Sequence, residues 1–342
     1  MNNTPYKPPY RITPAILHSI EQIGESLGQI SADTDGAVVP HLRRGNRLKT
    51  IQASLEIEGN TLSLEQVTAV LSGKRVLGQP RELQEVRNAF AAYETLTQWN
   101  PTSPADLLAA HAVLMADLVD SPGRFRSGSV GIRRGTDVIH VAPPADRVPF
   151  LIKELLGWQE HTGEHPLVAS CVFHYEFEFI HPFEDGNGRM GRLLQTLLLS
   201  RWRPLFALIP VESVVRDRQQ EYYAVLGQAD QAAEATVFVE FMLAAILQAL
   251  RETLTSDQES DYQSDQVIRL LNCLKTMPCG AVALMTQLDL SHRPTFRKNY
   301  LHPALKAGLI EMTQADTPRA RSQKYRLTPN GKQQANKISG DS

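Results

Sequence analysis

The stretch "HPFEDGNGRMGR" at residues 181–192 is the most informative part of this 342-residue chain. An apolar helical pattern ends just before it, near Ile180, and a second, strongly apolar helical pattern begins at about Arg189. Between them the residues 186–188 can adopt backbone angles that bulkier residues avoid, so that successive N–H groups point into one concavity. The N-terminal end of the following helix adds unpaired amides and positive partial charge, an arrangement suited to phosphate.

The charged side chains of the stretch support the same interpretation. Arg189 and Arg192 lie three residues apart on the expected helix, so they share a face on which they could hold phosphate oxygens. Asp185 is a hard carboxylate at the edge of the concavity, where it could hold Mg²⁺ against those phosphates. The ordinary pKa of histidine is about 6.5, so His181 could accept a proton near neutral pH. Together these groups indicate phosphorus transfer, although Gly-Asn-Gly loops between helices also occur without any ligand.

The stretch fits every position of the Fic family signature, His-x-Phe-x-(Asp/Glu)-Gly-Asn-Gly-Arg-x-x-Arg, and the chain resembles that family over roughly 105–245. The resemblance implies transfer of AMP from ATP to a Ser, Thr or Tyr hydroxyl of a target protein, possible targets including the chain itself, with release of pyrophosphate. Gly188 favours nucleotide transfer over phosphorylation, because the phosphate-transferring Doc branch has a Lys at this position. The resemblance implies that His181 is the base, that Asp185 binds Mg²⁺ and that Phe183 anchors the loop in the core. It also implies that ATP phosphates are cradled by Gly186, Asn187 and Gly188, and that their β/γ end is held by Arg189 and Arg192.

A β-hairpin is expected upstream of this stretch, because 130–133 and 138–141 are rich in β-branched residues and flank a turn at 134–137. The family resemblance identifies it with a flap that docks the target by strand addition. The flap residues would be Val130, Gly131, Ile132, Val138, Ile139 and His140.

Other aromatic and charged residues near the stretch have two interpretations each. The resemblance suggests an adenine pocket near 221–226, lined by Tyr222 or Tyr223, but core packing is an equal alternative for either ring. His174 lies seven residues before His181 on the same helix and is interpreted as a core histidine, or as one that supports a site residue, rather than as a catalytic one. A solvated face is the default expectation for three acids: Glu176, Glu178 and Glu184.

Far upstream, "SLEIEG" at 54–59 matches the inhibitory pattern of the family, (Ser/Thr)-x-x-x-Glu-(Gly/Asn). Ser54 and Glu58 are four residues apart and share one face of a helix predicted over 47–59. The resemblance implies that Glu58 forms an ion pair with Arg192, so that a γ-phosphate and a carboxylate compete for one guanidinium. The same glutamate could instead orient a water molecule, which would make the protein a remover of AMP.

The C-terminal part predicts a winged helix-turn-helix, with helices followed by strands at 310–314 and 324–328. Between Ser291 and Lys332 there are nine Lys or Arg and two acids. A winged helix that reads DNA would carry such an excess, but the default interpretation is a protein-docking or dimerisation module whose charges are solvated. A DNA-binding regulator with a nucleotide-sensing Fic core is therefore a rival to the enzyme. The cations that argue for DNA are Arg293, Arg297, Lys298, Arg319, Arg321, Lys324 and Arg326.

The whole chain is thus predicted to be mainly α, with a Fic-type helical core, a hairpin flap and a winged helix. The expected division is an N-terminal helical region at 1–104, a catalytic core at 105–250, a linker or surface helix end at 251–264, and the winged helix at 265–342. A net charge of −2 argues against a chain that coats nucleic acid or membrane along its length. Three widely spaced cysteines, no N-terminal signal core and no membrane-length apolar run favour a cytoplasmic location, and a homodimer is possible.

Overall fold

The computed structural model describes residues 6–33, 40–129, 131–134, 137–263, 265–290, 292–314 and 322–340. The chain is mainly α-helical, as predicted, and forms two compact units, 1–251 and 252–342. Within the described residues, no helix has the length and apolar character needed to cross a membrane.

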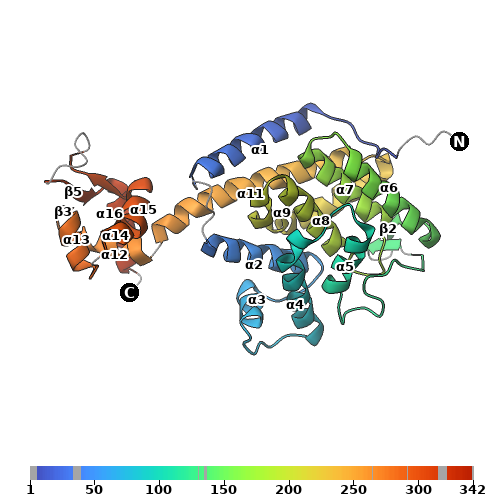
Figure 1. Cartoon of the computed structure of the whole chain (residues 1–342), viewed down its shortest axis with the longest axis horizontal. Helices are drawn as coiled ribbons and strands as arrows, with labels where there is room; N and C mark the ends of the chain where they lie inside the picture. Colours follow the sequence, from blue (N-terminus) through green and yellow to red (C-terminus); the bar gives the residue numbers. More distant parts are fainter. Residues whose placement is uncertain are drawn as a thin grey trace. The chain divides into compact units, whose positions relative to one another are not determined.

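The first unit holds the predicted Fic-type core (Figure 1). Helices α7 and α8 pack directly against each other, α2 and α5 also contact α8, and α4 packs on α2 and α5. The bounds of the helices are α1 (Pro14–Asp33), α2 (Pro40–Ile57), α3 (Leu64–Leu71), α4 (Pro80–Glu94), η1 (Leu96–Gln98), α5 (Pro104–Leu114), η2 (Ala145–Arg147), α6 (Val148–His161), α7 (Pro166–Ile180), α8 (Asn187–Trp202), η3 (Pro204–Leu208), α9 (Val211–Asp217), α10 (Gln219–Ala232) and α11 (Thr236–Gln263).

Helix α7 is buried on every side, and all of its residues except Pro166 and Phe179 are buried. The expectation of a solvated face for Glu176 and Glu178 is therefore wrong: they are 5% and 7% exposed. A helix surrounded by other helices has no face left for water, so its acids must find partners inside the protein. Glu176 accepts a hydrogen bond from the Tyr6 hydroxyl at 2.6 Å. Glu184, in the loop, is exposed as expected.

Helix α1 runs along α11 in the same direction (Figure 1). Near its start Thr13 donates to Glu240, and further along Arg251 donates to Gln22. One apolar stripe of α1, at Ile16 and Ile23, is fully buried. Because these residues are seven apart, they lie on one face of the helix, which attaches the N-terminal segment to the core.

Helix α2 carries the inhibitory pattern, but its limits differ from the predicted 47–59. It begins earlier, at Pro40, and ends at Ile57. Gly59 has a φ of +89°, a left-handed conformation that glycine adopts without strain and that ends helices. Asn60 then closes the turn, since its N–H donates to the carbonyl of Leu55. Glu58 consequently lies in the turn after the helix.

The predicted hairpin is present as β1 (Gly131–Arg134) and β2 (Asp137–Val141). The strands are antiparallel, with Gly131 opposite Val141 and an irregularity after Ile132. Val130 and the turn at 135–136 lie outside the described residues.

The second unit has the helix and strand order of a winged helix-turn-helix. In the part of it that the structure describes, an antiparallel sheet has the order β3-β5-β4, so one short strand joins the two that were predicted. Periodicity could not reveal a strand of two residues such as β3. The elements are α12 (Asp265–Cys273), β3 (Cys279–Gly280), α13 (Ala281–Gln287), α14 (Arg293–Phe296), η4 (Arg297–Leu301), α15 (His302–Lys306), β4 (Ile310–Met312), β5 (Lys324–Leu327) and α16 (Pro329–Gly340).

The segment 251–264 was predicted to be a linker or a surface helix end, and the structure continues α11 through it to Gln263. The segment contains no Gly or Pro, and adding a residue to an existing helix costs little compared with starting a new one. The helix therefore extends past the apolar part that is buried in the first unit.

Candidate active site

His181 is the residue at which the chain leaves helix α7. It has a φ of +50°, an uncommon left-handed conformation for a residue other than glycine, and its N–H still donates to the carbonyl of Phe177. Non-glycine residues stay in this conformation only where the surroundings hold them. The buried guanidinium of Arg126 supplies that support, since its Nε donates to the His181 carbonyl at 2.7 Å.

Arg126 also joins His181 to the hairpin. Its Nη1 donates to the carbonyl of Gly128, just before β1, and its Nη2 donates to the carbonyl of Pro143, just after β2. One side chain thus fixes the ends of the hairpin relative to the histidine. Nothing in the local sequence predicted this, because its partners are backbone carbonyls up to 55 residues away.

The loop after His181 is held from inside by its own residues. The Asn187 side chain accepts from the N–H of Phe183 at 2.8 Å and donates to the carbonyl of the same residue at 2.9 Å. The Phe183 ring is fully buried and stacks on His111, with ring centroids 3.7 Å apart. Phe183 therefore occupies the core, as the resemblance implied, and Asn187 shapes the loop through its side chain.

His111 fixes the other end of the loop. Its Nδ1 accepts from the N–H of Gly123 at 2.8 Å, which leaves the Nε2 proton to donate to the carbonyl of Asp185 at 3.1 Å. Burial lowers the pKa of His111, because it disfavours the charged imidazolium. His111 is a second supporting residue that sequence reasoning missed.

The predicted anion nest is only partly correct. Helix α8 begins at Asn187, two residues earlier than expected, so Gly188 has ordinary helical geometry and only Gly186, with a φ of +83°, is left-handed. Gly188 is small for another reason: a methyl group there would collide with Glu58 Oε1 and would lie 3.1 Å from Nη1 of Arg192. The first N–H groups of a helix lack partners within the helix, which makes the first turn of α8 a candidate anion site.

Arg192 is buried and is held by the inhibitory segment. Its Nη2 donates to Glu58 Oε1 at 2.7 Å and to the carbonyl of Ser54 at 3.0 Å, while its Nε donates to the Ser54 hydroxyl at 3.1 Å. Burial alone would lower the pKa of Arg192, but Glu58, Tyr222 and Glu178 together outweigh it and raise this pKa. The structure therefore brings Ser54, Glu58 and Arg192 together.

Two further buried acids lie near Arg192. Burial raises the pKa of Glu212, which accepts from the hydroxyls of Tyr93 and Thr196, each at 3.0 Å. Burial also acts to raise the pKa of Glu178, but His174, His181 and Arg192 outweigh it and lower this pKa. The guanidinium of Arg192 is thus the positive centre of an acidic interior.

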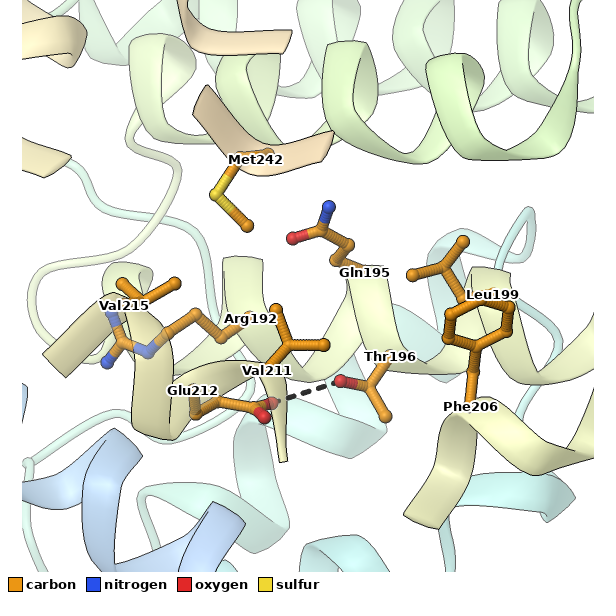
Figure 2. A pocket seen from close by; sticks show the side chains of 9 residues that line it. All are labelled: Arg192, Gln195, Thr196, Leu199, Phe206, Val211, Glu212, Val215 and Met242. Carbon is orange, nitrogen blue, oxygen red and sulfur yellow. Dashed lines mark hydrogen bonds between the residues drawn. The ribbon is translucent and has the colours of Figure 1, made fainter. Parts of the chain in front are cut away.

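A small cavity of about 10 Å³ lies beside Arg192 (Figure 2). Figure 2 shows Glu212 next to Arg192 and hydrogen-bonded to Thr196, with Met242 on the opposite wall. This volume suffices for one water molecule at most. This cavity is therefore too small to hold a phosphate beside Arg192.

Asp185 and Arg189 lie on the outer side of the loop. Asp185 is 40% exposed, and its Oδ1 accepts from the N–H of Gly186 at 2.6 Å and from Nη2 of Arg189 at 3.1 Å. Among the described residues no group of three or more His, Cys, Asp or Glu could form a metal centre. A lone hard carboxylate nevertheless fits Mg²⁺, which proteins commonly hold with one or two carboxylates, water and substrate phosphates.

The two candidate adenine-pocket tyrosines differ. Tyr222 is fully buried, packs on Phe238 and Phe241, and its hydroxyl lies 3.2 Å from Nε2 of His174, so it is a core residue in this structure. Tyr223 is partly exposed and donates to the carbonyl of Ile57 at the end of α2. His174 is fully buried, as expected.

Two sequence families match parts of the chain. Residues 101–199 match the sequence model of the Fic/DOC family, and residues 265–328 match the C-terminal domain of the Fic-like "filamentation induced by cAMP" proteins.

Several known proteins are similar to the chain. The crystal structure of a Fic family protein from Desulfovibrio desulfuricans G20 is 58% identical, with a TM-score of 0.71 over 95% of this chain and 99% of that one. Protein adenylyltransferase fic-1 of Caenorhabditis elegans is 29% identical over 63% of this chain and 42% of that protein. Protein adenylyltransferase Fic of Drosophila melanogaster is 28% identical over 66% and 45%. The chain thus spans less than half the length of these curated relatives.

Proposed function

The chain belongs to the Fic family, and we propose that it is a protein adenylyltransferase, which transfers AMP from ATP to a hydroxyl of a target protein and releases pyrophosphate. The pairing of Arg192 with Glu58 is the observation that carries this proposal. A buried guanidinium beside the first turn of a helix is an anion site, and here a carboxylate of the same chain occupies it.

The pairing also accounts for regulation. The γ-phosphate of ATP and the Glu58 carboxylate require the same guanidinium, so ATP binds in a productive position only when Glu58 leaves. Glu58 lies after the end of α2, in a turn that pivots at Gly59, and its side chain is 30% exposed. A turn residue of this kind can move without unfolding the helix before it.

The remaining groups have distinct roles in the proposed reaction. His181 takes the proton of the target hydroxyl as its oxygen attacks the α-phosphorus, and Arg126 holds the histidine backbone for that step. Arg189 and the amides of the first turn of α8 bind phosphate oxygens. Asp185 would hold Mg²⁺, which when bound neutralises phosphate charge. The hairpin would align the target segment by strand addition.

The test measures the transfer of label from ATP to protein. The chain and its Glu58→Gly variant are incubated with Mg²⁺ and ATP labelled at the α- or the γ-phosphate. We expect protein-bound α-label to rise about tenfold or more in Glu58→Gly, if the paired state holds nine-tenths or more of the wild-type molecules. It should vanish when His181→Ala is added.

The matched control is Glu56→Ala. Glu56 lies two residues from Glu58 but is exposed and pairs with Arg216 at 3.2 Å, so its loss should leave labelling unchanged. Transfer of γ-label alone would instead identify a kinase. Release of AMP from labelled protein by the wild type, but not by Glu58→Gly, would identify a de-AMPylase.

We further propose that the second unit contacts duplex DNA. The segment of α14, η4 and α15 buries Phe296 and Tyr300, whereas Arg293, Arg297 and Lys298 are exposed. No acid occurs between 293 and 306. In the wing, which consists of β4, β5 and the segment between them, Arg326 pairs with Glu311 at 2.6 Å. Arg319 and Arg321, in that segment, lie outside the described residues. The proposed partner surface therefore includes the exposed cations of the helical segment of α14, η4 and α15.

A further inference from the structure

Four charged side chains close a ring between α4 and the active-site loop. Arg81 and Glu85 are four residues apart on α4, and Asp185 and Arg189 are four residues apart at the start of α8. The charges alternate around the ring. The N···O distances are 3.5 Å for Arg81–Glu85, 3.3 Å for Glu85–Arg189, 3.1 Å for Arg189–Asp185 and 2.8 Å for Asp185–Arg81.

The ring has a buried side and an exposed side. Arg189 and Glu85 are 4% and 11% exposed, whereas Asp185 and Arg81 are 40% and 53% exposed. The Arg189–Glu85 pair is therefore shielded from water and from salt. The Arg81–Asp185 pair is open to solvent, so a dissolved cation can compete for this carboxylate.

The ring is also joined to the inhibitory turn. Oε2 of Glu85 accepts from the Asn60 side chain at 2.9 Å, and Asn60 follows Glu58 by two residues. On the other side, Arg81 Nη1 donates to the carbonyl of Leu118 at 3.2 Å, which holds the guanidinium beside the loop. The N-terminal region thus neutralises the phosphate-binding and metal-binding groups together: Glu58 pairs with Arg192, Glu85 with Arg189, and Arg81 with Asp185.

From this ring we infer that the guanidinium of Arg81 pairs with Asp185 in the resting protein, competes with the divalent cation for this carboxylate, and thereby sets the affinity of the site for that cation. The inference rests on the proposed function. An incoming cation must displace the guanidinium from Oδ2 of Asp185, and it also meets the positive charge of Arg81 nearby. Arg81 can then remain beside Glu85, so the ring opens at its exposed side without leaving a buried charge unpaired.

The opposite role would give the opposite result. If Arg81 only oriented Asp185 for the metal, its removal would weaken metal binding. If Arg81 competes with the metal, its removal strengthens binding. The direction of the change therefore separates the two roles.

The experiment uses the full chain with Glu58→Gly, so that the nucleotide can enter, and a non-hydrolysable ATP analogue. Calorimetry measures the affinity for the analogue with Mn²⁺ and with EDTA, and the ratio of the two affinities reports the metal contribution without any turnover. We expect Arg81→Gln to increase this ratio up to about fivefold at low salt, the range found for solvent-exposed ion pairs. The increase should shrink at high salt.

The matched control is Arg87→Gln on the same helix, an exposed arginine that contacts Gln84 at 3.4 Å and should leave the ratio unchanged. Arg81→Ala, checked for folding by circular dichroism, is the second variant and should repeat the increase. An unchanged or reduced ratio in both Arg81 variants overturns the inference while the proposed function stands. A Glu58→Gly parent that binds no analogue overturns the proposed function itself.

Discussion

The two units of this protein carry arginines in opposite environments. On α8, Arg189 and Arg192 are 4% and 3% exposed, and each contacts a carboxylate. On α14 and η4, Arg293 and Arg297 are exposed, and no acid shares their helical segment. The two proposals therefore assign the same residue type to two kinds of anion recognition.

The difference shows what burial adds to a positive charge. A buried guanidinium must have a partner, so before any ligand arrives one is supplied by the chain, and ligand binding becomes an exchange of one anion for another. An exposed guanidinium is satisfied by water and small ions, and binding then releases those ions. The first arrangement suits a single phosphate under control, and the second suits a long polyanion.

The largest expected effect is the difference in stability lost when one arginine is removed from each unit. Arg192→Ala should lower the free energy of unfolding of the first unit by about 3–5 kcal/mol, because it leaves a cavity in the packed interior and removes a positive charge close to the buried Glu178 and Glu212. Arg297→Ala should change the stability of the second unit by about 0.5 kcal/mol or less. Urea denaturation followed by circular dichroism measures both. Equal effects in the two units would contradict the comparison.

The next largest effect is the dependence of DNA affinity on salt concentration. If Arg293, Arg297 and Lys298 each neutralise one phosphate, the logarithm of the affinity for duplex DNA should fall with a slope of about −2.7 against the logarithm of salt concentration. Each substitution of one of them by alanine should reduce that slope by about one. Fluorescence anisotropy of a labelled duplex measures the slope.

The salt dependence of nucleotide binding by Glu58→Gly can be compared with that of DNA binding in the same molecule. The proposed nucleotide site rests on the buried Arg189 and Arg192, which are shielded from salt, so the affinity for nucleotide should depend less on salt than the affinity for DNA does. A DNA affinity that is insensitive to salt would refute the proposed contact and favour a protein-docking role for the second unit.

The smallest effect concerns pH. Burial lowers the pKa of His111, so in the folded protein it takes up a proton at lower pH than in the unfolded chain. The unfolded state then binds more protons below about pH 6.5, and the stability contributed by neutral His111 is lost as pH falls from that value. Unfolding of the first unit, measured between pH 7.5 and about pH 5, should show this loss.

His111→Gln should be less stable at neutral pH but should lose less stability on acidification than the wild type. His292 is an exposed histidine in the second unit, so His292→Gln serves as the control and should keep the wild-type pH dependence of the first unit. An unchanged pH dependence in His111→Gln would rule out this residue as the source.

Much of the first unit could be predicted from local patterns. Helical periodicity and start and stop residues act within a few positions, so the helices around 181–192 and the hairpin were found. The end of α2 near Gly59 followed from the left-handed conformation that glycine adopts there. The pairing of Glu58 with Arg192 came from the family resemblance, because 134 residues separate the two.

Other features depended on packing and had no local signal. A solvated face was expected for Glu178, but α7 is enclosed. Glu178 is therefore buried among positive partners, His174, His181 and Arg192, that lower its pKa. Gly188 was expected to supply backbone freedom, yet it sits in a regular helix and supplies space for Glu58.

The sequence by itself determined which chemical groups this protein has and on which helices and loops they lie, because hydrophobic periodicity and turn chemistry are local. Only the tertiary structure decided which charges meet. Arg81 and Asp185 are 104 residues apart, and they pair because the fold brings Arg81 and Glu85 of α4 against Asp185 and Arg189. Partners, burial and the space beside a glycine are properties of packed elements, and they therefore become defined only when the helices are assembled.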